Sequence, residues 1–90
     1  MNYNKLVAEF LGTLLLVLSI LASGGNALFV GLTLAVVIYF TGSTSGGHIN
    51  PAVSFAMYLR KRMSLEDLLS YSVAQLAGAA SSVYVFKMLA

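Results

Sequence analysis

One stretch of this sequence, residues 45–54, could do chemistry on a polar solute, and it reads Ser-Gly-Gly-His-Ile-Asn-Pro-Ala-Val-Ser. Asn50 fits the N-cap of a helix, and Pro51 fits the first helical position because its missing N–H is not needed there. If this helix begins inside a membrane, its free N–H groups and positive dipole end face whatever lies beside them. The Asn50 amide could then donate a hydrogen bond to a passing water or hydroxyl group.

The residues before Asn50 could supply the matching acceptors. A ladder of backbone carbonyls replaces the hydration of a neutral solute, while the dipole of the helix raises the barrier for protons and cations. Asn50-Pro51 taken alone would favour an ordinary helix N-cap without a transport role, and the pore role depends on the context of residues 45–54. The predicted pore-lining residues are Gly46, Gly47, His48, Ile49, Asn50, Pro51 and Ala52.

The remaining reactive side chains do not form a catalytic or metal site. His48 is the only histidine, cysteines are absent, and the acidic residues number three. A general base or a metal would need partners, and Glu66 and Asp67 are expected near the membrane interface. Glu9 lies within an apolar run, where an ionisable residue is a functional candidate. We therefore expect no enzyme activity, no metal and no cofactor.

The composition predicts a membrane protein. The chain has 90 residues, of which 59% are hydrophobic and only 9% are charged, whereas a soluble domain has about 25% charged residues. The net charge of +2 comes without an extended basic surface, so nucleic acid is not an expected partner. The expected partner is instead the lipid bilayer.

Three apolar segments are expected to cross the bilayer, and an irregular segment lies between the second and third. A helical span needs about 17 to 25 residues. The first segment could also be a signal peptide, but Glu9 within it and the apolar segments after it argue against cleavage. The predicted spans are about 6–22, 27–42 and 67–87, with a loop and a short helix over about 43–59.

The short helix is predicted to be re-entrant. From Asn50 to Leu59 it would extend about 15 Å, half of a bilayer, and it ends at the basic run 60–62. Irregular backbone at membrane depth is tolerated only where protein buries it or where it lines a water-filled cavity. The alternative is a surface helix that lies in the interface.

Basic residues predict the orientation. Lys5 and the run Arg60-Lys61-Arg62 fall on one side if the short helix is re-entrant, and Lys87 falls on the other. The positive-inside rule then places the N-terminus and the basic run in the cytoplasm.

Small residues at a spacing of four predict close helix contacts in lipid. They occur in the second span, at Gly31 and Ala35, and in the third, at Ala74, Gly78 and Ser82.

Residues 45–54 resemble the first Asn-Pro-Ala (NPA) loop of the aquaporin, or major intrinsic protein, family. Ala8-Glu9-Phe10-Leu11-Gly12-Thr13 and Ala74-Gln75 with Gly78 extend the resemblance over essentially the whole chain, but only to the first of the family's two repeats. It implies an all-α membrane protein, an aquaporin-like half repeat with three transmembrane helices and one re-entrant NPA half-helix. It also implies a homotetramer, and that Glu9 and Gln75 brace the loop.

Two departures from the family pattern bear on function. Val30 stands where many members have an aromatic residue or histidine that narrows the filter, so glycerol becomes a candidate solute beside water. The second NPA loop and its filter arginine are missing, so the chain needs a second half. We expect a fragment of a longer protein rather than two copies in opposite orientations. The alternative function is a non-conducting subunit that packs against other helices.

Overall fold

The chain folds as four helices over residues 3–90, the residues that the computed structural model describes. The first two helices are joined by a short turn, and a longer loop, residues 42–50, precedes the third. The helices are α1 (Tyr3–Ser23), α2 (Ala27–Thr41), α3 (Pro51–Leu59) and α4 (Leu65–Leu89).

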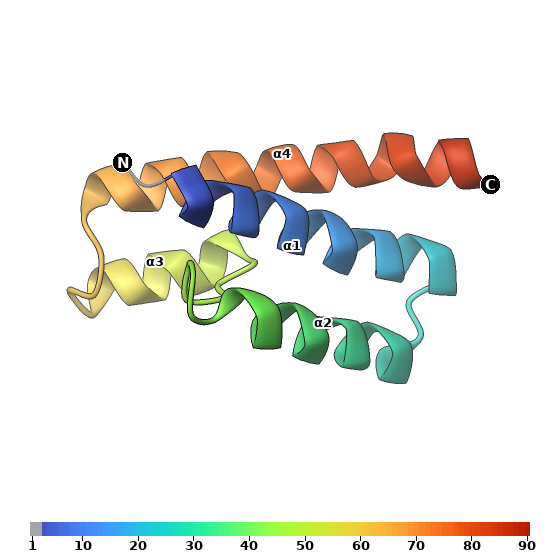
Figure 1. Ribbon diagram of the computed structural model, residues 1–90, viewed down its shortest axis with the longest axis horizontal. Coiled ribbons are helices and arrows are strands. Elements are labelled where there is room, and N and C mark those ends of the chain that lie inside the picture. The colour runs from blue at the N-terminus through green and yellow to red at the C-terminus, as the bar shows by residue number, and fades with distance from the viewer. Residues whose placement is uncertain (1–2) are drawn as a thin grey trace.

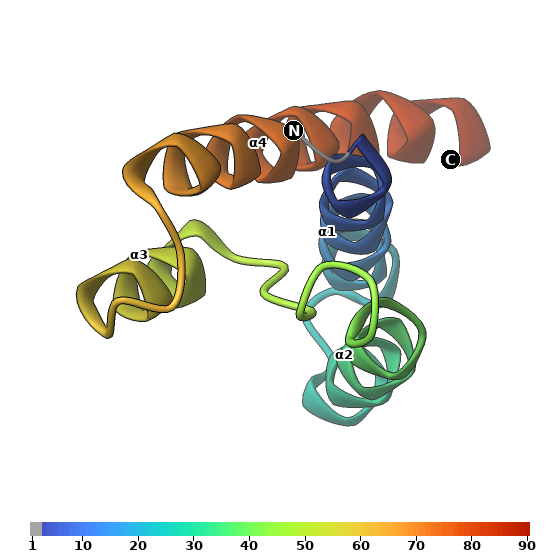
Figure 2. The same cartoon turned by 60° about the vertical axis from the view of Figure 1, so that its left-hand side comes forward.

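α1 is the centre of the arrangement. It packs against α4 along one side and against α2 along the other, while α3 packs against α4 (Figures 1 and 2). The loop 42–50 bridges the gap between α2 and α3 (Figure 2). α3 begins near the C-terminal end of α2 and runs back toward the end of the molecule where the N-terminus lies (Figure 1).

Local capping accounts for the helix ends. Asn26 caps α2, where its side chain accepts a hydrogen bond from the Phe29 N–H at 2.9 Å. Ser64 caps α4 in the same way through the Asp67 N–H at 3.1 Å. Acidic residues in the first turn of α4 and Lys87 in its last turn complement the helix dipole. These caps set the bounds of the elements without help from distant residues.

Of the described helices, one is both long and apolar enough to cross a membrane by itself. This is α1, with 21 residues and a mean hydropathy of 2.2, which corresponds to a length of about 31 Å. α2 is apolar but has 15 residues, and α4 has 25 residues but is less apolar. α4 carries polar residues on its buried face, such as Gln75 and Ser82, and charged residues near its ends.

The distribution of side chains is the reverse of that in a water-soluble domain. Leu11, Leu69 and Val73 are among the large apolar residues that are at least half exposed on the outer faces of α1 and α4. Large exposed apolar surfaces are unfavourable in water and ordinary in lipid. The buried polar and charged residues are Glu9, Thr13, Ser19, Ser45, Ser54, Gln75 and Ser82.

The predicted close helix contact is confirmed at Gly78 but not at Gly31. A methyl group on Gly78 would overlap the Phe10 carbonyl oxygen and come within 3.2 Å of the Leu14 nitrogen, so α4 touches the backbone of α1. A methyl group on Gly31 would meet nothing within 4 Å in the part of the chain that the structure describes. Gly31 therefore makes no close helix contact among the described residues, and the prediction at that position stays a prediction.

The basic residues are divided between the two ends of the molecule, whose longest dimension is 39 Å. The first turn of α1 and the turn between α3 and α4 lie toward one end of the molecule, and the last turn of α4 lies at the opposite end (Figure 1). Lys5 belongs to the first of these segments, the run 60–62 to the second and Lys87 to the third.

Candidate functional site

The loop 42–50 has an unusual backbone that the sequence suits only in part. Gly46 and Gly47 have φ angles of +92° and +64°, which glycine adopts without strain. Ile49 has a φ of +60°, which is rare for a β-branched residue. A strained conformation persists only where the surrounding structure imposes it, so the contacts of this loop with the helices are the centre of the site.

The Glu9 carboxylate of α1 organises the loop. Its Oε2 accepts hydrogen bonds from the Ser45 hydroxyl at 2.6 Å and from the His48 N–H at 3.1 Å. Its Oε1 accepts from the Ile49 N–H at 2.8 Å and from Gln75 Nε2 at 2.7 Å. An ionised carboxylate has about four acceptor sites, and all of them are used at a residue with 0% exposure. Four hydrogen-bond donors therefore satisfy this buried carboxylate.

Ile49 is anchored at three points, which explains how it keeps a positive φ. Its N–H donates to Glu9, and its carbonyl accepts a hydrogen bond from the Thr13 hydroxyl at 3.2 Å. Its side chain is 1% exposed. Gly12 provides the space, because a methyl group there would lie 2.5 Å from Ile49 Cδ1 and 2.9 Å from Val37 Cγ1.

α4 holds the loop from its other side. The Tyr71 hydroxyl donates to the Ser45 carbonyl at 2.7 Å, and its ring lies 5.0 Å from the imidazole of His48 between centroids. Gln75 donates both to Glu9 and to Ser54 Oγ, the latter at 3.0 Å. Ser54 Oγ is also hydrogen-bonded to His48 Nδ1 at 2.8 Å. One polar network thus joins α1, the loop, α3 and α4.

α3 begins as the sequence predicts, with Asn50 as N-cap and Pro51 as its first residue. Asn50 has an extended backbone, and its Oδ1 accepts a hydrogen bond from the Ala52 N–H at 2.8 Å. Asn50 itself is exposed. Because its oxygen is occupied, the amide nitrogen is the group that Asn50 can offer to a solute.

The seven consecutive residues that the sequence predicts as a pore lining, 46–52, differ in their exposure. Gly46, Asn50 and Ala52 are exposed, His48 and Pro51 are half-buried, and Gly47 and Ile49 are buried. Glu9 and Gln75 lie behind them, fully buried. Val30 is not brought to this site, since it precedes the end of α2 by eleven residues, or about 16 Å along the helix.

Sequence reasoning missed Thr13, Ser45, Ser54 and Tyr71 as members of the network. A signal was present for two of them. Thr13 follows Glu9 by four residues, and Tyr71 precedes Gln75 by four, so each pair shares a helix face. For Ser45 and Ser54 the sequence holds no comparable signal, because their partners are distant in the chain.

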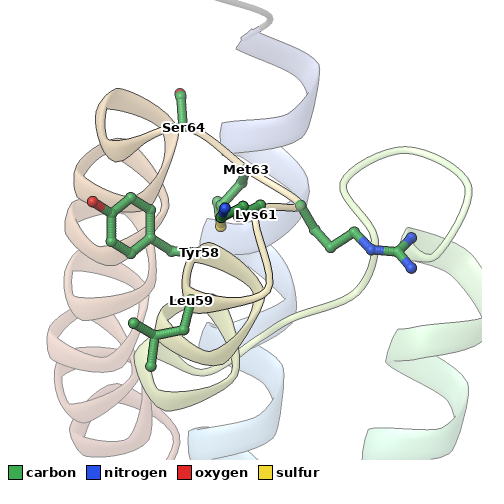
Figure 3. A pocket seen from close by; sticks show the side chains of 6 residues that line it. Tyr58, Leu59, Lys61, Met63 and Ser64 are labelled. Carbon is green, nitrogen blue, oxygen red and sulfur yellow. The ribbon is translucent and has the colours of Figure 1, made fainter.

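A shallow hollow of about 620 Å³ lies at the far end of α3, away from the network. It lies at the turn between α3 and α4, and Figure 3 shows the side chains that line it, among them Tyr58, Leu59, Lys61, Met63 and Ser64. The hollow is apolar on its α3 side and basic at Lys61 and Arg62. Within residues 3–90, no group of three His, Cys, Asp or Glu side chains could hold a metal ion.

Apolar outer faces around a buried polar network, with a short helix whose N-cap is exposed, define an all-α protein of the membrane type. The chain belongs to the major intrinsic protein family, whose sequence profile matches residues 1–90. The resemblance of residues 45–54 to this family is thereby confirmed.

Three relatives illustrate the family. Aquaporin Z of Brucella melitensis biotype 1 is 40% identical over 97% of this chain and 44% of its own length. Glycerol uptake facilitator protein-like 6 of Lactiplantibacillus plantarum is 40% identical over 84% of this chain and 39% of its own length. The lens fiber major intrinsic protein of Gallus gallus is 40% identical over 86% of this chain and 34% of its own length.

Family membership settles the class of the protein and leaves its details open. Proteins of this family are integral membrane channels and not enzymes, so the expectation that the chain is not an enzyme is confirmed. The chain spans less than half of the length of these relatives. No solved structure matches it significantly.

Proposed function

We propose that this chain forms the first half of a passive channel for water or small neutral solutes such as glycerol. The observation that carries the proposal is the start of α3. There an exposed Asn50 caps the helix with its oxygen, and the preceding loop is held rigidly by buried hydrogen bonds to Glu9. The names of the relatives, which include an aquaporin and a glycerol uptake facilitator, support the same class of solute.

In the proposed mechanism, the solute exchanges its hydration shell for groups of the loop. The N–H of the Asn50 amide donates to the oxygen of the solute, and the backbone carbonyls of residues 46–49 accept its hydrogens. The α3 dipole, positive at Pro51, opposes the passage of cations and protons. Glu9 and Gln75 act as braces. Glu9 accepts hydrogen bonds from the His48 and Ile49 N–H groups, which would otherwise compete for the solute, and Gln75 donates to Glu9 and so holds the carboxylate in place.

The proposed topology places α1, α2 and α4 across the bilayer, and α3 as a re-entrant half-helix. With nine residues, α3 is about 14 Å long, half of the hydrocarbon thickness. The N-terminus and the turn 60–62 then face the cytoplasm, in accord with the positive-inside rule. The N-terminal end of α3 would meet the corresponding half-helix of a second, inverted repeat at the midplane of the bilayer. The complete channel would assemble as a homotetramer.

Stopped-flow light scattering on proteoliposomes tests the proposal. The 90-residue chain and a chain that continues into a second NPA loop are each reconstituted at equal protein density. We expect the longer chain to raise water or glycerol permeability well above that of empty vesicles. Asn50→Asp, which places a negative charge at the helix start, should abolish the increase for neutral solutes.

The outcome for the shorter chain separates two readings. Permeability with the 90-residue chain alone means that copies associate into a pore. Permeability in neither preparation, with insertion verified by protease protection, contradicts the channel and leaves a non-conducting subunit that packs against other helices.

A further inference from the structure

We infer that Ser54 is a positioning residue for His48. Together with Gln75 it holds the imidazole in the tautomer whose proton is on Nε2, so that the ring presents an N–H donor beside Gly46. Ser54 is 0% exposed, and its hydroxyl oxygen is 2.8 Å from His48 Nδ1. Which of these two atoms donates follows from the rest of the network.

The Glu9 carboxylate determines which atoms of the network donate and which accept. Two backbone N–H groups and the Ser45 hydroxyl donate to its carboxylate, which has only acceptors in its ionised form. The fourth partner, Gln75, lies 2.7 Å from Oε1 and must therefore present its NH₂ group there.

The second hydrogen of that NH₂ group determines whether the Ser54 hydroxyl donates or accepts toward His48. Gln75 Nε2 is 3.0 Å from Ser54 Oγ, which has to accept the bond. The Ser54 hydroxyl keeps its own hydrogen to donate. Among the residues that the structure describes, the other hydrogen-bond partner of Ser54 Oγ is His48 Nδ1. Nδ1 is therefore the acceptor, and a neutral imidazole that accepts at Nδ1 carries its proton on Nε2.

The opposite tautomer would leave a buried donor unpaired. If Nδ1 carried the proton, Ser54 Oγ would accept twice, and its hydroxyl hydrogen would have no acceptor among the described residues around a side chain that is 0% exposed. A buried donor without a partner costs about 1–3 kcal/mol in general. Reversing the Gln75 amide does not help, because its oxygen would then face the Glu9 carboxylate. In the observed arrangement that oxygen, Gln75 Oε1, is itself buried without a partner.

The consequence for transport rests on the proposed function, while the tautomer itself does not. A methyl group on Gly46 would lie 3.3 Å from His48 Nε2, so this nitrogen is adjacent to an exposed part of the loop. The carbonyls of the loop offer acceptors only. A fixed N–H at Nε2 adds a donor to them, which suits a solute that needs both, such as water or a polyol.

Nitrogen-15 NMR of histidine-labelled protein in lipid bilayers tests the assignment. His48 is the only histidine of the chain, so both ring signals are unambiguous. For the neutral imidazole we expect Nδ1 to resonate as an unprotonated acceptor and Nε2 as an N–H, in a single form. A proton on Nδ1, or comparable amounts of both forms, would overturn the inference whatever the permeability of the vesicles.

A matched pair of serine variants tests the part played by Ser54. Ser54→Ala should replace the single form with a mixture of tautomers, and Ser54→Thr, which keeps the hydroxyl, should restore it. Ser82→Ala is the control, because Ser82 is equally buried but donates only to the Ala79 carbonyl of its own helix. An unchanged spectrum in Ser54→Ala contradicts the role of Ser54. If that variant does not fold, the wild-type spectrum still decides the tautomer.

Discussion

At the scale of single residues, Glu9 explains how a charge can lie within an apolar helix. Its carboxylate accepts four hydrogen bonds, three of them from the segment 45–49 and one from α4. The charge therefore ties a loop with a strained backbone to two helices. Hydrogen bonds to a charged group contribute about 1.5–3 kcal/mol each, which makes this residue the one on which the shape of the loop depends most.

Glu9→Gln should loosen the loop although it preserves the size of the side chain. The new NH₂ group would point a donor at other donors, and we expect the free energy of unfolding to fall by about 1.5–3 kcal/mol. Chemical unfolding in detergent, followed by circular dichroism, measures this. Glu66→Gln is the control, because Glu66 is exposed in the first turn of α4. Equal stability of the two variants would contradict the bracing role.

Val30 is the residue at which solute size can be tested. It lies in α2 away from the loop network, so its replacement should leave the NPA site intact. In a chain that conducts, Val30→Phe should lower glycerol permeability severalfold and water permeability less, because the larger ring narrows the path. Vesicle swelling in a glycerol gradient measures the ratio. Leu28→Phe serves as control, since Leu28 is 73% exposed. An unchanged ratio would remove Val30 from the filter.

At the scale of the elements, glycines determine how closely the helices approach. Gly78 lets α4 touch the backbone of α1, and Gly12 gives room to Ile49 and Val37. Both contacts support the loop indirectly, because α1 carries Glu9 and α4 carries Gln75. A shift between these two helices would separate the carboxylate from the amide.

Gly78→Ala and Gly31→Ala should have opposite effects on stability. The first creates an overlap with the Phe10 carbonyl, and overpacking of this kind typically costs about 1–3 kcal/mol. The second adds a methyl group in open space, where alanine is the better helix former by about 0.8–1 kcal/mol. Thermal unfolding in detergent compares them. Destabilisation by Gly31→Ala would indicate that α2 has a packing partner outside this chain.

At the scale of the whole molecule, the chain buries a set of polar residues and exposes many large apolar ones, and three of its five basic residues form the run 60–62. This pattern matches a bilayer environment and predicts a single orientation.

Single cysteines can determine the orientation, since the chain has none of its own. Lys61→Cys and Lys5→Cys should react with a membrane-impermeant thiol reagent from the same side of sealed vesicles. Lys87→Cys should react from the opposite side. The reason is that α1, α2 and α4 each cross the bilayer and α3 returns to the side that it came from. Labelling of the Lys61→Cys and Lys87→Cys variants from the same side would exclude the proposed topology.

The sequence alone determined those features that depend on neighbouring residues. Low charge and long apolar runs indicated a membrane, and Asn50-Pro51 marked the start of α3, because capping is a local interaction. The family could also be recognised in this way, since its motif is contiguous. The small-residue spacing predicted the contact at Gly78, whereas Gly31 has no neighbour within 4 Å among the described residues, because spacing does not say which face of a helix has a neighbour.

The tertiary structure alone decided the contents of the polar network. Ser45 and Ser54 look like ordinary small residues in the sequence, yet one donates to a carboxylate 36 residues away and the other bonds to an amide 21 residues away. Partners so distant meet only after the helices have packed. The physical reason is that a buried polar group must find its partner wherever the fold places one, and that place cannot be read from local sequence.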